Sequence, residues 1–175
     1  MAFHSQFKDE DAATIACGCA VLPIRTTCRG PAPSLTAGKE DIIDEVLFFF
    51  KANVLFRNFE VRGSADRLLV YLTLYVTECL KRVEAAPSKA DAVRALNNMA
   101  LESFAIPGDA SFTLGPYFPT PENRQEADFV RSYFRQLREE TGRRVVEKCY
   151  IDGETRVPSK WWTSLSKRRF MNKAL

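Results

Sequence analysis

Apolar and polar residues alternate at helical spacing along much of the chain. In residues 39–57 the apolar positions fall three and four residues apart, and Asp41 and Glu45 lie near the start, where the positive end of a helix favours acids. Phe48 and Phe56 widen the apolar stripe. The pattern therefore predicts a helix that is buried on more than one side.

The longest apolar surface lies in residues 65–85. Only Thr73 and two tyrosine hydroxyls interrupt it between residues 68 and 76, and a helix that is apolar all round must be enclosed by protein. Its β-branched residues also suit a strand. The length between a capping Ser64 and a terminating Pro87 favours a helix, which we expect to be the centre of the fold.

A third helix is expected from Ser88 to about Glu102, with an acid three residues after the serine in a near capping-box arrangement. A long loop, residues 103–121, follows it. Because aromatic residues lie among its turn residues, we expect this loop to be packed and to contribute to an interaction surface. Tyr117 and Phe118 are its candidate interface residues.

A fourth helix is expected to begin near Thr120 and to continue to about Tyr150. Its apolar stripe passes Gly142, so one long helix is our interpretation, and a helix end at Gly142 is the alternative. A turn at Asp152 and a last helix that begins at Pro158 complete the pattern.

Residues 1–38 have no regular pattern, and their prolines favour an extended backbone. We predict an all-α fold in one domain, with about five helices in residues 39–175 around the central helix and an extended arm in residues 1–38. The arm is expected to lie over a partner or over its own domain. Its candidate interface residues are Leu22, Pro23, Ile24, Arg25, Pro31 and Pro33.

Charge is distributed unevenly along the chain. The net charge is +3, but residues 155–175 carry +6 and no acid, which leaves −3 for the remainder. This basic tail also holds both tryptophans, a residue type that often anchors interfaces. We expect one tryptophan to be buried and residues 160–173 to present charge to an acidic partner. The candidate interface residues of the tail are Lys160, Trp161, Trp162, Lys167, Arg168 and Arg169.

Targeting signals are not expected in this sequence. The first residues include Lys8 and three acids without an apolar core, unlike a secretory signal or a mitochondrial presequence. The longest uncharged apolar run, residues 68–77, is far shorter than the roughly 20 residues of a membrane span. Five cysteines, an odd number, favour a reduced cytosolic compartment.

The residue types in the sequence argue against an enzyme. His4 is the single histidine and lies in a segment expected to be loose, and the glycines form no phosphate loop. Cys17 and Cys19 with Cys28 resemble part of a metal site, but buried thiols are the simpler expectation. The adjacent acids at 139 and 140 are expected to be solvated. We predict no enzyme, cofactor or metal.

Short stretches spread along the chain, in order, carry a family resemblance: Leu22-Pro23-Ile24-Arg25, Gly30-Pro31-Ala32-Pro33, Asp41-Ile42-Ile43-Asp44-Glu45, Phe50-Lys51-Ala52-Asn53-Val54, Tyr71-Leu72-Thr73-Leu74-Tyr75, Ile106-Pro107-Gly108 and Pro158-Ser159-Lys160-Trp161-Trp162-Thr163. Together they resemble the 21 kDa subunit, subunit 3, of the actin-related protein 2/3 complex. No single stretch is a catalytic signature, but the ordered set is specific.

The resemblance implies a helical, non-enzymatic scaffold subunit of a complex that nucleates branched actin filaments. It implies docking mainly on the actin-related protein 3 subunit, near the mother filament, with further contacts to the other subunits. No small-molecule substrate, nucleic acid or membrane insertion is implied, and the expected location is the cytoplasm, at cortical actin. The alternative from the residues alone is a helical adaptor that binds RNA or acidic lipid through the basic tail.

Overall fold

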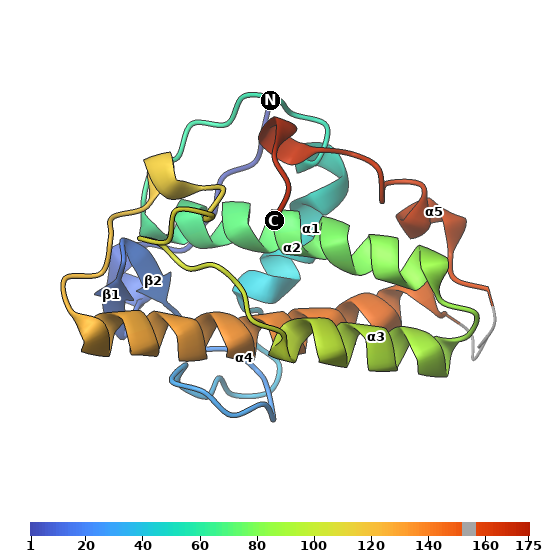
Figure 1. The fold of residues 1–175 in the computed structure, drawn as a ribbon, viewed down its shortest axis with the longest axis horizontal. Coiled ribbons are helices and arrows are strands. Elements are labelled where there is room, and N and C mark those ends of the chain that lie inside the picture. The colour runs from blue at the N-terminus through green and yellow to red at the C-terminus, as the bar shows by residue number, and fades with distance from the viewer. Residues whose placement is uncertain (152–156) are drawn as a thin grey trace.

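The computed structural model describes residues 1–151 and 157–175, and the expected turn at Asp152 and the basic Arg156 lie outside these residues. The described residues form five α-helices and a small β-hairpin, and Figure 1 shows the hairpin at one end of the molecule. The helices are α1 (Ile42–Asn53), α2 (Ser64–Ala85), α3 (Lys89–Leu101), α4 (Arg124–Cys149) and α5 (Lys160–Thr163), and the strands are β1 (Thr14–Ala16) and β2 (Cys19–Val21).

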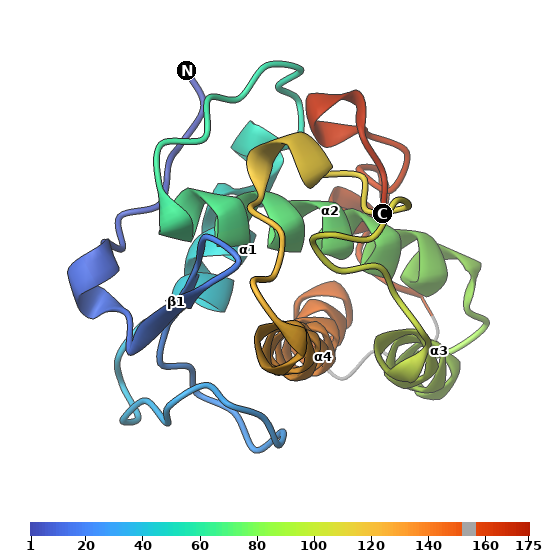
Figure 2. The same cartoon turned by 60° about the vertical axis from the view of Figure 1, so that its left-hand side comes forward.

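Helix α2 lies at the centre, as its apolar surface predicts. It packs against α1, α3, α4, α5 and β2, and Figure 2 shows it crossing α3 and α4, which are seen nearly end-on. The buried hydroxyls of Thr73 and Thr77 donate to carbonyl oxygens one turn earlier in the helix, at 2.7 and 3.3 Å. These bonds satisfy the two threonine hydroxyls, whereas the buried hydroxyl of Tyr75 on the same helix has no hydrogen-bond partner among the described residues.

Local capping residues set most helix starts. Asp41, Ser88 and Asn123 each accept a bond from the backbone N–H three residues later, at 3.0, 3.2 and 2.9 Å. The predicted start at Ser88 is confirmed. The fourth helix begins after Asn123, about one turn later than the start predicted near Thr120.

Helix α4 is continuous through Gly142, which confirms the prediction of one long helix. A Cβ added to Gly142 would lie 3.4 Å from Cβ of Leu96 on α3. The glycine therefore lets α3 and α4 approach closely, and it does not end the helix.

The prediction of a purely α-helical fold is wrong in the N-terminal region. Strands β1 and β2 pair antiparallel, with Ile15 opposite Ala20. The two turn residues, Cys17 (φ 47°) and Gly18 (φ 71°), both have positive φ, as a two-residue hairpin loop requires. Each strand has only three residues, too few for an alternating pattern to stand out in the sequence.

The N-terminal segment is anchored to the helical body. Asp66, near the start of α2, contacts Nδ1 of His4 at 2.7 Å and accepts from the backbone N–H of Ser5 at 2.8 Å. The expectation that His4 lies in a loose terminus is therefore wrong. Farther along, the backbone of Ile24 pairs with Pro33 and Leu35, which closes the loop between them (Figure 1).

The last predicted helix is much shorter than expected. Helix α5 is a single turn, and a separate 3-10 turn follows at Phe170–Asn172. There Met171 has φ 55° and its N–H donates to the carbonyl of Phe56 at 2.9 Å, which ties the end of the chain to the segment after α1.

No helix in residues 1–151 and 157–175 combines the length and apolar character needed to cross a membrane.

Candidate functional site

A groove of about 1090 Å³ follows the outer side of α1. The N-terminal segment, the second half of α4 and α5 form its walls. We call it the α1 groove and distinguish two ends. Its polar end comprises Arg25, Asp41, Asp44, Arg143, Arg144 and Glu147, and its aromatic end comprises Phe48, Phe49, Lys51, Lys148, Trp161 and Trp162.

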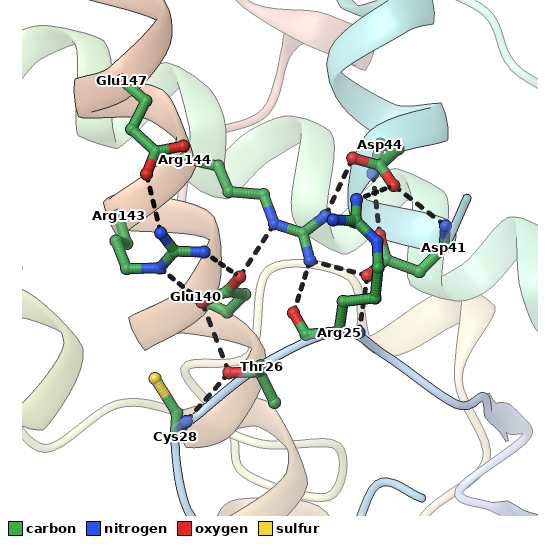
Figure 3. A network of polar contacts seen from close by, with 9 residues as sticks. All are labelled: Arg25, Thr26, Cys28, Asp41, Asp44, Glu140, Arg143, Arg144 and Glu147. Atoms are coloured by element: carbon green, nitrogen blue, oxygen red, sulfur yellow. Dashed lines mark hydrogen bonds and ion pairs between the residues drawn. The ribbon is translucent and has the colours of Figure 1, made fainter. Parts of the chain in front are cut away.

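Arg144 is the centre of the polar end (Figure 3). Its guanidinium donates to both oxygens of Asp41, each at 2.6 Å, to Asp44 at 3.0 Å, and through Nε to Glu140 at 2.9 Å. Asp41 caps α1 and Glu140 lies one turn before Arg144 on α4. The network therefore joins the start of α1 to the middle of α4.

The same network holds the N-terminal arm. Arg144 donates to the carbonyl of Arg25 at 2.7 Å, and the hydroxyl of Thr26 donates to Glu140 at 3.3 Å. The backbone N–H of Cys28 then donates to the Thr26 hydroxyl at 2.9 Å (Figure 3). These contacts explain why the arm follows one path over the helices.

Burial and ion pairing act against each other on the pKa values of this network. Burial acts to raise the pKa of Asp41 and Glu140, but the bonds from Arg144 and backbone donors to Asp41, and from Arg143 and Arg144 to Glu140, outweigh it and hold both pKa values below their ordinary values. For Arg144, burial would lower the pKa, but the hydrogen bonds that its guanidinium donates to the neighbouring carboxylates, and their negative charge, raise it. The expectation that Glu140 is a solvated acid is wrong, because its side chain is fully buried.

The aromatic end is exposed. Phe48 is 84% exposed and Trp161 66%, whereas Trp162 is 7% exposed and stacks on Phe50 with ring centroids 6.0 Å apart. Lys51 lies against both indoles and donates to the carbonyl of Trp161 at 3.1 Å. Burial there lowers the pKa of Lys51 to about 8. The expectation that one of the two tryptophans is buried is confirmed.

The candidate residues of the arm and the aromatic loop are mostly part of the chain's own packing. Leu22, Ile24 and Phe118 are buried in the core. Pro23 and Arg25 are half-buried, the latter through its pair with Asp44. The candidates with intermediate exposure in these regions are Pro23, Arg25, Pro31, Pro33 and Tyr117.

The candidate bases of the tail remain on the surface. Lys160 precedes Trp161 at the aromatic end, and Lys167, Arg168 and Arg169 follow α5. All four residues are exposed. The structure thus brings Trp161 and Trp162 together with α1, which sequence reasoning did not connect with the tail.

Sequence reasoning missed Phe48 as a surface residue. It was expected to widen a buried stripe, but the buried positions of α1 lie on one face and Phe48 lies outside it. The sequence contains a signal for this exposure. Leu47 and Phe50 are three residues apart and already occupy inward-facing positions of the helix, which leaves Phe48 on another face.

The cysteines are packed and unreactive in their surroundings. Cys17, Cys19, Cys79 and Cys149 are buried free thiols, and Cys28 is half-buried. Burial and the nearby Glu126 raise the pKa of Cys17 to about 12, so the thiol stays protonated at neutral pH. Within the described parts of the chain, no group of three or more His, Cys, Asp or Glu residues is placed to hold a metal ion.

Comparison with known proteins gives a consistent result along the whole chain. The family model for the ARP2/3 complex ARPC3 (21 kDa) subunit, P21-Arc, matches residues 1–175. "Actin-related protein 2/3 complex subunit 3" of Dictyostelium discoideum is 50% identical and covers 100% of both chains. The proteins of the same name from Arabidopsis thaliana and Schizosaccharomyces pombe are 42% and 46% identical over 98% and 99% of both chains. The similarity is therefore not confined to one segment.

Proposed function

The chain belongs to the ARPC3 family, the 21 kDa subunits of the ARP2/3 complex, and on this premise we propose that it docks on the actin-related protein 3 subunit and lies near the mother filament. Members of this family are non-enzymatic structural subunits, with a role in actin nucleation and branched actin networks. The docking places the chain in the cytoplasm, at cortical actin structures. The resemblance inferred from the sequence is confirmed.

The aromatic end of the α1 groove is the observation that carries the docking proposal. Trp161 and Phe48 both belong to the lining of the groove, and both are largely exposed. Exposed aromatic clusters mark interaction surfaces, and tryptophan is among the residues that contribute most to binding. Lys148 and Lys160 are exposed beside them, which suits the acidic surface expected of an actin-like partner.

The basic tail extends this surface. Lys167, Arg168 and Arg169 are exposed and supply long-range attraction to an acidic partner or filament. The half-buried Pro31, Pro33 and Tyr117 remain secondary candidates. Leu22, Ile24 and Phe118 act in the proposal by fixing the shape of the chain, because their side chains are inside it.

Cross-linking of the assembled complex tests the choice of partner. A lysine-reactive cross-linker followed by mass spectrometry is expected to join Lys160 and Lys148 to the actin-related protein 3 subunit. Lys89, at the start of α3, is the control and is expected not to react with that subunit. Cross-links from Lys160 and Lys148 that reach only other subunits would contradict the proposal.

Binding of RNA or acidic lipid is the second candidate, and the exposed tail bases favour it. Such binding would weaken steeply as salt rises, because basic residues release the counterions of a phosphate backbone. Replacing Lys167, Arg168 and Arg169 together by alanine would abolish it. Binding of vesicles or RNA that survives this replacement rules the candidate out.

A further inference from the structure

Helix α4 carries two buried arginines with opposite surroundings. Arg138 and Arg144 are each 6% exposed. Arg144 meets three carboxylates, whereas Arg138 makes no ion pair with any of the residues the structure describes. A buried charge without a counterion is costly, so the surroundings of Arg138 call for an explanation.

The contacts of Arg138 leave part of its guanidinium unused. Nη2 donates to the carbonyl of Met99 at 2.6 Å, Nη1 reaches the hydroxyl of Tyr71 only at 3.4 Å, and the buried Nε has no partner. The rings of Tyr75 and Phe104 lie 4.6 and 4.3 Å from the guanidinium carbon. Met99 is in the last turn of α3, so Arg138 also caps that helix end.

A pocket of about 300 Å³ adjoins Arg138. Its lining comes mainly from α2 and from the loop after α3, and Figure 1 shows this loop passing close to α2. Its walls include four aromatic rings, those of Tyr71, Tyr75, Phe104 and Phe112. The volume is at the lower end of the range for small-molecule sites, and the lining combines these rings with polar and charged side chains, among which Arg138 is buried.

We propose that this cavity, the Arg138 pocket, binds a carboxylate carried on an apolar or aromatic group. A guanidinium presents its N–H donors in a planar fork that matches a carboxylate, and the contacts with Met99 and Tyr71 use only part of that set. The aromatic walls suit the apolar body of the ligand. A small carboxylic acid and an acidic side chain of a neighbouring subunit share this chemistry.

The other charged groups of the lining set the position of the carboxylate. Glu78 is paired with Lys81 at 2.7 Å, which reduces its repulsion. Glu102 and Arg82 are exposed and add one charge of each sign at the pocket, and Leu175 also belongs to the lining, where its terminal carboxylate adds a further negative charge. The carboxylate of the ligand therefore lies at the Arg138 end, and replacing Glu102 by glutamine is expected to tighten binding.

Titration of the full-length chain with benzoate, followed by NMR, tests the pocket. Saturable shifts are expected at Met99, Tyr75 and Phe104, and none with benzyl alcohol, which has the same ring without the charge. Arg138→Met is expected to weaken binding at least about tenfold. Arg135→Met removes an exposed arginine of the same helix and is expected to leave binding unchanged.

Absence of saturable binding of benzoate by the unaltered chain would overturn the proposal, whether or not any variant folds. Equal binding of benzyl alcohol would also overturn it. Arg138→Lys keeps the charge but loses the fork, and binding as tight as that of the unaltered chain would contradict the role of the guanidinium.

The same titration of the assembled complex identifies the source of the carboxylate. Loss of the benzoate site there shows that an acidic side chain of a neighbouring subunit occupies the pocket. A retained site assigns the pocket to a free small carboxylate. Both results support the pocket, and neither depends on the docking of the aromatic end.

Discussion

The two ends of the α1 groove differ in where their chemistry is directed. At the polar end, Arg144, Asp41 and Glu140 bond to one another and to the arm, so their charges are used within the chain. At the aromatic end, Phe48 and Trp161 are exposed while their neighbours Phe50 and Trp162 are buried. The difference separates a cluster that maintains the fold from a surface that is available to a partner.

Breaking the polar end is expected to have the largest effect on stability. Arg144→Met leaves Asp41 buried without a cation and leaves Glu140 paired with Arg143 alone, which should lower the free energy of unfolding by about 3–5 kcal/mol. Urea unfolding of the isolated chain measures this change.

Arg143→Met is the matched control for that variant. Arg143 is the adjacent residue, and its pairs with Glu140 and Glu147 involve a side chain that is 53% exposed. The expected loss is below about 1 kcal/mol. Equal losses for the two variants would show that the buried network does not hold the fold.

At the aromatic end, the two tryptophans allow a buried and an exposed side chain to be compared directly. Trp162→Ala removes a buried indole that stacks on Phe50 and should cost about 3 kcal/mol. Trp161→Ala removes an exposed one and should change the free energy of unfolding by less than about 0.5 kcal/mol. Thermal unfolding of both variants checks this, and a similar loss in each would mean that Trp161 also supports the fold.

Acid is expected to weaken the polar end selectively. Because the folded pKa values of Asp41 and Glu140 lie below their ordinary values, their stabilisation is complete above about pH 5 and is lost as pH falls through the folded values. In Arg144→Met, Asp41 has no cation and Glu140 keeps only Arg143, so both carboxylates are easier to protonate. The difference in free energy of unfolding between the unaltered chain and Arg144→Met should therefore narrow from pH 7 to pH 3 in urea unfolding. A constant difference would contradict the role of Arg144.

Helix positions could be predicted from the sequence because caps and apolar spacing are local. Ser88 begins α3 and α4 passes through Gly142 as predicted. The hairpin could not be predicted, because Cys17 has the left-handed conformation, which is uncommon for a residue other than glycine. The length of the last helix was also overestimated, since an apolar and basic pattern continues beyond the single turn of α5.

The candidate site was harder to predict because it depends on contacts between residues that are far apart in the sequence. Asp41 and Arg144 are 103 residues apart in the chain, so their pairing leaves no local pattern. Several residues with strong family resemblance, such as Leu22 and Ile24, are buried in the core. Resemblance identified the family correctly, but only the three-dimensional structure separates interior residues from the surface.

The most direct test of the account is a competition for incorporation into the complex. The double variant Phe48→Ser with Trp161→Ala is mixed with an equal amount of the unaltered chain during assembly, and mass spectrometry measures the incorporated ratio. Leu101→Ser, which alters an exposed apolar residue of α3, is the control. We predict that the double variant keeps its thermal stability but is at least about tenfold depleted in the complex, while the control is not. Equal incorporation of the double variant and the unaltered chain would contradict the assignment of the aromatic end as the docking surface.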